Sequence, residues 1–215
     1  MPSELDSPAA SDAAPDATTA PAARKRPKPG ERRVQILQAL AQMLEQPGAE
    51  RVTTAALAAR LDVSEAALYR HFASKAQMFE GLIDFVESSV FGLVNRINDQ
   101  AGEGRARAAR IVAMVLQFGE KNPGMTRVMV GDALVFEHER LQQRMNQLFD
   151  KLEAALRQCL REGADGAGAL TPDADAQVTA SVLTAFMVGR LQRFARSGFR
   201  RSPSERLDAC IASML

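Results

Sequence analysis

Cysteine and histidine are scarce in this 215-residue sequence, which has two residues of each type. Cys159 and Cys210 are isolated, since neither belongs to a C-x-x-C pair or has a histidine nearby at the spacing of metal ligands. His71 and His138 also lack a companion nucleophile or a second ligand at a readable spacing. We therefore expect no enzyme, no catalytic residues, no metal site and no cofactor, and we expect His138 to be a solvated or helix-capping residue.

Long apolar runs are absent as well. No stretch of about 20 apolar residues could form a helix that spans a bilayer, and the N-terminus has neither the basic start nor the apolar segment of a secretory signal. Segments that favour β-strands are few, and the apolar residues recur at helical spacing. The sequence predicts a cytoplasmic, all-α protein with no membrane partner.

The net charge is only +1, but the charges are unevenly distributed. Residues 1–23 carry four acids and no base, and almost no large apolar side chain, so we expect this segment to be disordered. Residues 24–33 carry six basic residues and one acid. We expect the basic arm at 24–30 to contact the phosphate backbone or the minor groove of DNA, with a solubilising tail as the alternative.

Residues 53–75, TTAALAARLDVSEAALYRHFASK, predict two short helices joined by a tight turn. Thr53 or Thr54 can cap the first helix, because a threonine hydroxyl accepts a hydrogen bond from a free N–H group at a helix start. Asp62 lies in the turn, at a point that needs a left-handed backbone, which Asp tolerates better than most residues. The apolar residues of the first helix share one face: Leu57, Ala58 and Leu61.

Ser64 is expected to cap the second helix, with Leu68 and Phe72 turned inward. The small residues Ala66 and Ala67 would let the two helices cross closely. This arrangement is typical of a helix-turn-helix, whose second helix enters the DNA major groove. An ordinary helical hairpin is the alternative. The residues expected to face the groove or its phosphate walls are Glu65, Ala66, Tyr69, Arg70 and His71.

Further helices are expected on both sides of this motif. A helix at 31–46, ended by Pro47-Gly48, would complete a DNA-binding domain at 31–75, and helices at about 74–97, 104–121, 125–129, 137–161, 173–194 and after 203 would build a domain at 76–215. The stripe expected to face the core of the first helix is Val34, Leu37, Leu40, Ala41 and Leu44. The stripe expected on the helix from 173 is Val178, Val182, Ala185, Phe186, Gly189 and Phe194.

Two features predict a homodimer. The long amphipathic helices at 137–161 and 173–194, joined by a loop, suggest a four-helix bundle made by two subunits. A single short recognition helix also reads few base pairs, whereas a two-fold pair reads a palindrome in double-stranded DNA with half-sites about 34 Å apart. Ala185 and Gly189 would allow close helix approach, unless they belong to an ordinary packed core.

The motif T-x-x-L-A-x-x-x-D-V-S-x-x-x-L-Y-x-x-F-x-x-K at 54–75 resembles the N-terminal DNA-binding domain of the TetR family, with Asp62 in place of the family's usual Gly. The segments FGEKNPGMTRVM, ALVFEHERLQQRMNQLF and LRQCLRE also resemble the nucleoid occlusion factors of that family, so that the likeness runs from Arg32 to about Phe199. It implies a TetR-like fold, with a DNA-binding domain followed by a helical domain for dimerisation and partner binding.

The resemblance further implies a function at the nucleoid. Such a protein binds palindromic chromosomal sites and, when bound, inhibits the division GTPase FtsZ, so that no septum closes over the nucleoid; no small-molecule ligand is expected. The residues assigned to DNA are Arg32, Arg33, Thr53, Thr54, Ser64, Glu65, Ala66, Tyr69, Arg70, His71 and Lys75. Those assigned to FtsZ lie between the fourth and fifth helices and in the turn that follows: Phe85, Arg96, Lys121 and Asn122.

Alternatives remain for these assignments. Phe85 could be a core residue, and Arg96 and Lys121 could be ordinary solvated charges. A ligand-responsive transcriptional repressor of the TetR type is the second candidate function, because methionines fill irregular apolar space and could line a ligand cavity instead of a core. An architectural DNA-binding dimer is a third. The methionines concerned are Met114, Met125, Met129, Met145 and Met187.

Overall fold

The computed structural model describes residues 30–46, 52–162 and 172–215. The expected disordered segment, most of the basic arm, the Pro47-Gly48 pair and the loop from 163 to 171 lie outside the described residues. All regular elements within the described ranges are helical, and no strand occurs among them. The all-α prediction is confirmed.

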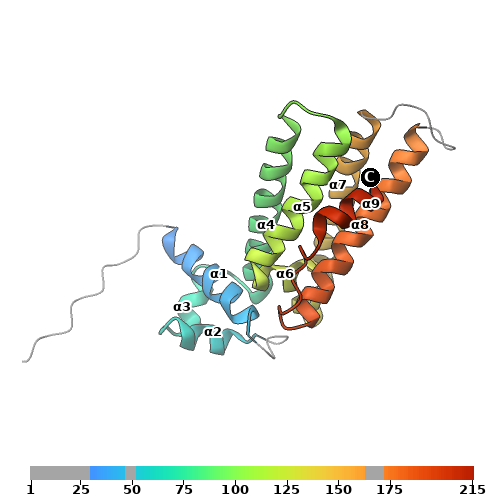
Figure 1. Cartoon of the computed structure of the whole chain (residues 1–215). Coiled ribbons are helices and arrows are strands. Elements are labelled where there is room, and N and C mark those ends of the chain that lie inside the picture. Colours follow the sequence, from blue (N-terminus) through green and yellow to red (C-terminus); the bar gives the residue numbers. More distant parts are fainter. Residues whose placement is uncertain (1–29, 47–51, 163–171) are drawn as a thin grey trace, which may run out of the picture.

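A small helical unit is attached to one end of a larger bundle (Figure 1). Helices α1 to α3 form the small unit, α4 leads from it into the bundle, and α5 to α8 complete the bundle, with α9 packed on α8. The bounds are α1 Glu31–Leu44, α2 Thr54–Arg60, α3 Glu65–Tyr69, α4 Lys75–Asn98, α5 Gly104–Lys121, α6 Pro123–Met129, the 3-10 turn η2 Asp132–Leu134, α7 Glu139–Glu162, α8 Pro172–Arg196 and α9 Leu207–Met214.

The helix-turn-helix is organised by the residues that its sequence predicts. The Thr53 hydroxyl accepts a hydrogen bond from the N–H of Ala56 at 3.2 Å, and the Ser64 hydroxyl accepts one from Ala67 at 3.3 Å, so each residue is an N-cap. Asp62 has a φ of 54°, in the left-handed region expected for the turn. Leu68 and Phe72 are each 1% exposed. Local hydrogen bonding thus explains both helix starts.

Asp62→Val should lower the free energy of unfolding by about 1–2 kcal/mol. The left-handed backbone conformation costs about this free energy for a residue with a Cβ, and the β-branched Val side chain cannot offset it with a local hydrogen bond as Asp can. Asp62→Asn is the matched control, since Asn tolerates the same conformation. Urea denaturation monitored by circular dichroism measures both variants. Equal stability of the Val and Asn variants would contradict the left-handed turn.

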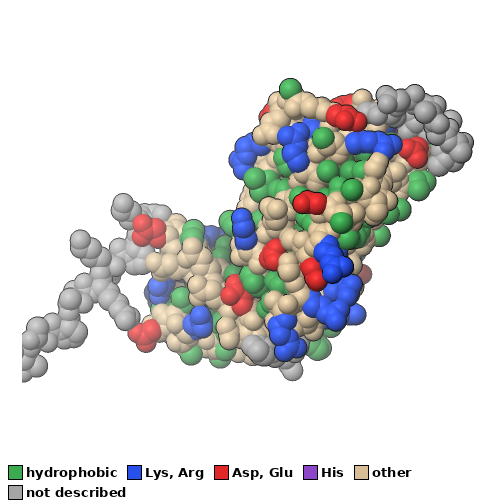
Figure 2. All heavy atoms as spheres, viewed as in Figure 1, with side chains coloured by type: hydrophobic (Ala, Val, Ile, Leu, Met, Phe, Trp, Pro, Cys, Tyr) green, Lys and Arg blue, Asp and Glu red, His purple; other side chains and the backbone are tan. Residues whose placement is uncertain are grey.

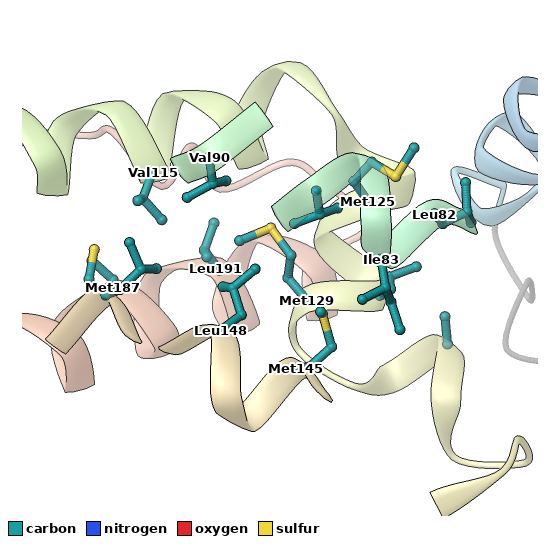
Figure 3. Close-up of a cluster of buried hydrophobic side chains, with 14 of the residues drawn as sticks. Leu82, Ile83, Val90, Val115, Met125, Met129, Met145, Leu148, Met187 and Leu191 are labelled. Atoms are coloured by element: carbon teal, nitrogen blue, oxygen red, sulfur yellow. The ribbon is translucent and has the colours of Figure 1, made fainter. Parts of the chain in front are cut away.

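One continuous core runs from the small unit into the bundle. Figure 3 shows Met129 of α6, Met145 and Leu148 of α7 and Leu191 of α8 close together in this core. Met125, Met129, Met145 and Met187 are at most 8% exposed and belong to this cluster, and Met114 packs against it. These methionines therefore pack as core residues, which supports the core interpretation of their pattern over the ligand-cavity interpretation.

Two predicted stripes are wrong in part. On α1, Val34 is 53% exposed, because the side that packs most deeply is formed by Ile36, Ala39, Leu40 and Leu44. On α8, Val178 and Val182 are 53% and 48% exposed, because the core is met by the opposite side of that helix. The buried residues on α8 are Ala176, Ala180, Leu183, Met187, Leu191, Phe194 and Ala195, with Thr184.

The stripe of α7 is entirely buried within its own chain. Leu141, Met145, Leu148, Leu152 and Leu156 are at most 1% exposed, and α7 packs against α4, α5 and α8. The stripe cannot also form the predicted seam between subunits. Of α7 and α8, only α8 has large apolar side chains that are exposed, Val178 and Val182.

Candidate nucleic-acid interface and partner groove

The residues expected to contact DNA gather around the start of α2 and the outer side of α3. Thr53, Ser64, Glu65, Ala66 and Arg70 are exposed, Thr54 and His71 are half-buried, and Tyr69 is 45% exposed. Leu68 and Phe72 point the opposite way, into the core. The short α3 therefore presents hydroxyl, carboxylate, phenol and guanidinium groups on one surface, which are the groups that contact base edges and phosphates.

Thr54 and Glu65 join the starts of α2 and α3. The Thr54 hydroxyl donates a hydrogen bond to the Glu65 carboxylate at 2.6 Å. This bond restricts the carboxylate at the exposed start of the recognition helix. A carboxylate there would repel a phosphate but can accept a hydrogen bond from the amino group of cytosine, so its position favours base contact over backbone contact.

Three of the cations assigned to DNA, Arg32, Arg33 and Lys75, have protein partners. Arg33 donates to the backbone carbonyl of His71 and stacks with its guanidinium carbon 4.0 Å from the centroid of the Phe72 ring, which ties α1 to the end of α3. Arg32 donates to the Gln35 side chain at 2.9 Å. The Lys75 ammonium lies 2.5 Å from the carboxylate of Glu137. A phosphate would therefore have to compete with Glu137 for Lys75.

A groove lies between the small unit and the bundle. Val34 and Leu37 on α1, Leu82 and Phe85 on α4, and Met125 on α6 form its apolar walls, with Gln38, Ala41, Gln42 and Asn122 also lining it. Phe85 is 47% exposed, so the interpretation of this residue as core is wrong. Because the walls come from helices far apart in the sequence, only folding brings them together.

The structure brings some of the predicted FtsZ-binding residues together and leaves one apart. Asn122 lines the groove with Phe85 and donates from its side chain to the carbonyl of Phe118 at 2.7 Å. Lys121 is the exposed neighbour of Asn122. Arg96 is exposed, but it lies eleven residues after Phe85 on α4, which is about 16 Å along the helix axis at about 1.5 Å per residue. Arg96 therefore does not line this groove.

Sequence reasoning missed Val34, Leu37 and Met125 as groove residues. The spacing of Val34, Leu37 and Ala41 does mark one side of α1, but the same pattern was interpreted as the core stripe. The signal that could have separated the two interpretations is the second apolar side of α1, formed by Ile36, Ala39 and Leu40. A helix with two apolar sides has one for the core and one for another surface.

Ion pairs fix α4 against α7. Arg144 donates to Glu87 at 2.5 Å and to Asp84 at 2.9 Å, and Arg140 lies 2.7 Å from Glu80. Burial lowers the pKa of Arg144, but the hydrogen bonds to Glu87 and Asp84 outweigh it, and the net shift is upward. The Lys75–Glu137 pair lies at the start of α4, where the helix-turn-helix ends, and the pairs of Glu80, Asp84 and Glu87 come after it along the same helix.

Cys159 and His138 make hydrogen bonds with structural roles. Burial raises the pKa of the Cys159 thiol, which donates to the Asn98 side chain at 3.3 Å. His138 accepts a hydrogen bond from the N–H of Arg140 at 3.2 Å, which is the capping role expected for it. Within the described ranges, no three His, Cys, Asp or Glu side chains form a metal-binding group. None of the helices there is both long enough and apolar enough to cross a membrane.

Two family profiles match the chain. The profile for bacterial regulatory proteins of the tetR family matches residues 36–82, and the SlmA-like profile for the tetracyclin repressor-like C-terminal domain matches residues 103–214. Among solved structures, PfmR from Thermus thermophilus, a TetR-family regulator, has a TM-score of 0.66 at 19% identity, covering 84% of this chain and 94% of PfmR. FadR from Bacillus subtilis has a TM-score of 0.65 at 13% identity, covering 84% and 96%. These structures establish the fold.

Sequence relatives are more specific. The nucleoid occlusion factor SlmA of Photobacterium profundum is 51% identical over 82% of this chain and 90% of its own length. The SlmA proteins of Cronobacter sakazakii and Vibrio cholerae are 52% and 49% identical, over 83% and 82% of this chain and 90% of each relative. The chain belongs to the SlmA family of nucleoid occlusion factors, which combines a TetR-type DNA-binding domain with its own C-terminal domain.

Proposed function

We propose that this protein is a nucleoid occlusion factor, which binds palindromic chromosomal sites as a homodimer and, when bound, inhibits FtsZ assembly and septum formation over the nucleoid. It acts in the cytoplasm at the nucleoid and is not an enzyme. The observation that carries the proposal is the sequence identity of about half the residues with SlmA proteins over four-fifths of the chain. The groove at Phe85, beside the DNA-binding unit, supports a partner site there.

DNA binding is assigned to the domain at 31–75, with residues 76–215 for dimerisation and partner binding. The exposed hydroxyls of Thr53 and Ser64 suit phosphate contacts, and Glu65, Ala66 and Tyr69 suit base edges. The other assigned residues support these contacts from the edges of the motif. They are Thr54, Arg70, His71, Lys75, Arg32 and Arg33.

The dimer is assigned to the outer side of α8. Val178, Val182, Ala185 and Gly189 recur three or four residues apart and therefore lie along one side of the helix. Val178 and Val182 are about half exposed in the single chain. Burying them against a second copy would remove apolar surface from water, which favours association. The small Ala185 and Gly189 would let the two α8 helices approach closely.

The FtsZ contact is assigned to the groove at Phe85. A half-exposed phenyl ring with apolar walls on both sides suits an apolar side chain of a bound segment. Asn122, which lines the groove, and its exposed neighbour Lys121 add an amide and a positive charge. Arg96 would contact FtsZ only outside this groove. The site adjoins α1, so a bound segment would touch both the DNA-binding unit and the bundle.

Phe85→Ala should weaken FtsZ binding by about 1–2 kcal/mol, because an aromatic ring at the centre of an interface carries much of its free energy. DNA affinity and folding should be unchanged, since the ring is half exposed. Phe136→Ala is the matched control, because it removes an equally large ring that is 68% exposed outside the groove.

Co-sedimentation of the protein with FtsZ and GTP, with and without a bound palindromic duplex, tests the proposal. The wild-type protein with the duplex should reduce the sedimented polymer, and Phe136→Ala should act as the wild type. Failure of the DNA-bound wild type either to bind FtsZ or to change its polymerisation would overturn the proposed function. Equal activity of Phe85→Ala would overturn only the assignment of the groove.

A further inference from the structure

The C-terminal end of α8 and the segment that leads to α9 carry a dense group of arginines. Residues 190–206 contain six arginines and a single acid, in a chain whose net charge is +1. Figure 2 shows Lys and Arg side chains gathered at the lower end of α8, as placed in Figure 1. We call the exposed members the arginine patch: Arg193, Arg196, Arg200, Arg201 and Arg206.

The segment that carries the patch has a defined shape. The Ser197 hydroxyl accepts hydrogen bonds from the N–H groups of Arg200 at 3.1 Å and Arg201 at 2.9 Å. Phe199, with a φ of 64°, packs edge-on against Phe194 at 5.1 Å between ring centroids. The Arg127 guanidinium carbon also lies 5.2 Å from the Phe199 centroid. The backbone that presents Arg200 and Arg201 is therefore organised without a ligand.

Among the described residues, the arginines of the patch form no ion pair, although Glu205 lies beside Arg206 in the same segment. Arg140 and Arg144 on α7 have carboxylate partners on α4. In contrast, Arg193, Arg196 and Arg201 form no ion pair with any acid in the described ranges. Several unpaired guanidinium groups on one surface create a positive potential that attracts an anion, and their planar forks match phosphate oxygens.

The patch lies at the DNA-binding end of the bundle. Leu191 on α8 packs against Gly119, where an added Cβ would be 2.4 Å from the leucine Cδ2. Helix α6, which follows directly, contacts both α8 and α1, and its Gly124 lies against Ala41 of α1. Figure 1 likewise shows the C-terminal end of α8 at the end of the bundle that carries α1 to α3.

The proposed dimer would bring two patches together. For two reading heads to reach one face of the same duplex, the two-fold axis must be perpendicular to the DNA, so equivalent ends of the two α8 helices lie on the DNA side. The outer side of α8 with Val178, Val182 and Gly189 continues into Arg193 and Arg196. The two patches would then flank the axis above the middle of the palindrome, where they repel each other unless an anion lies between them.

We propose that the arginine patch binds the DNA phosphate backbone at the centre of the palindrome, as a contact separate from the helix-turn-helix. The proposal rests on the proposed function as a DNA-binding dimer. Arg196 and Arg201 are the residues best suited to the contact, because both are exposed, unpaired and at the end of α8 nearest the DNA-binding unit. The contact carries no base specificity and adds affinity that depends on salt.

The double variant Arg196→Gln with Arg201→Gln tests this contact on a duplex selected by the wild-type protein from a random-sequence library. The slope of log affinity against log salt should fall by about 0.9 for each phosphate that is no longer neutralised, thus by up to about 3.6 for the four arginines of a dimer, with affinity at least about tenfold lower at low salt. Arg105→Gln with Arg110→Gln is the matched control, because these arginines lie on α5 at the opposite end of the bundle.

Uncharged methylphosphonate linkages at the centre of the duplex provide a second readout. They should weaken the wild type and the control but leave the double variant unchanged. An unaltered salt slope for the double variant would overturn the proposal, and so would equal sensitivity of all three proteins to the uncharged linkages. Loss of FtsZ binding by a double variant that binds DNA normally would also overturn it, because the patch would then be assigned to a protein partner. Sedimentation equilibrium must show a dimer for each protein compared, and dissociation of the double variant would assign the arginines to the subunit interface instead.

The selection separates this inference from the proposed function. If the wild-type protein selects no palindromic sequence, the proposed function fails. If it selects one and the double variant binds it like the wild type, only the contact at the centre fails.

Discussion

Gly124→Ala should lower the free energy of unfolding by about 3 kcal/mol and weaken DNA binding. A Cβ at this position would lie 2.1 Å from the carbonyl oxygen of Ala41 and 2.9 Å from its carbonyl carbon. Both atoms belong to the backbone of α1, so no change of rotamer can relieve the clash. Overpacking of this kind costs about 1–3 kcal/mol, and more where the neighbour cannot move.

The expected effect on DNA binding follows from where this contact lies. Gly124 is on α6 in the bundle, whereas Ala41 is on α1 in the DNA-binding unit, so separation of the two backbones changes the direction in which α3 points. In a dimer, both reading heads would be displaced. The palindrome has a fixed half-site spacing, and displaced heads cannot both enter their grooves without bending the DNA or the protein.

Gly92→Ala is the matched control. Gly92 lies within α4 and has open space where a Cβ would be added. Because Ala favours a helix by about 1 kcal/mol over Gly, this variant should be as stable as the wild type or slightly more so. Urea denaturation and DNA titration measure both variants. If Gly124→Ala is as stable as Gly92→Ala, the close contact between α1 and α6 does not exist.

The features that the sequence predicted correctly depend on neighbours in the chain. Thr53, Ser64 and Asp62 act through hydrogen bonds or backbone angles within a few residues, so their roles follow from residue type and spacing. The helix-turn-helix and the order of the helices could therefore be predicted before any tertiary contact was known.

The features that the sequence did not predict depend on distant neighbours. Val34 has the spacing of a core residue, but the helix side that carries it meets α4 and α6 as the wall of a groove. Lys75 has the position of a phosphate contact, but Glu137, 62 residues away, lies within ion-pair distance of it. Periodicity shows that a helix side is apolar or charged and cannot show which element covers it.

The same limit explains the dimer surface. Helix α8 is apolar on two sides, and the sequence pattern does not distinguish the side that meets its own core from the side left for a second copy. The two sides differ only in their exposure in the folded chain. Leu183, Met187 and Leu191 are buried, whereas Val178 and Val182 are about half exposed. For α7, whose polar residues are confined to one side, the pattern predicted the buried side correctly but not that its own chain would cover all of it.

Tyr69→Ala should weaken binding to the selected palindrome by about 2–6 kcal/mol, because the dimer loses two side chains, each worth about 1–3 kcal/mol where it contacts a base. Tyr69 is 45% exposed on the outer side of α3, so folding should be unaffected. Tyr69→Phe, which keeps the ring, separates the contribution of the hydroxyl from that of the ring.

The composition of the chain allows a direct readout of this contact. Tyr69 is the single tyrosine in a sequence with no tryptophan, so the intrinsic fluorescence of the protein above the emission of phenylalanine comes from this residue alone. A ring that packs on bases or sugars should be quenched in proportion to the fraction bound, and the quenching curve should give the same Kd as a mobility-shift titration. Fluorescence that stays constant while the duplex saturates, together with wild-type affinity of Tyr69→Ala, would contradict the contact of Tyr69 with DNA, because an exposed ring on the outer side of the recognition helix should leave bulk water when that helix lies against DNA.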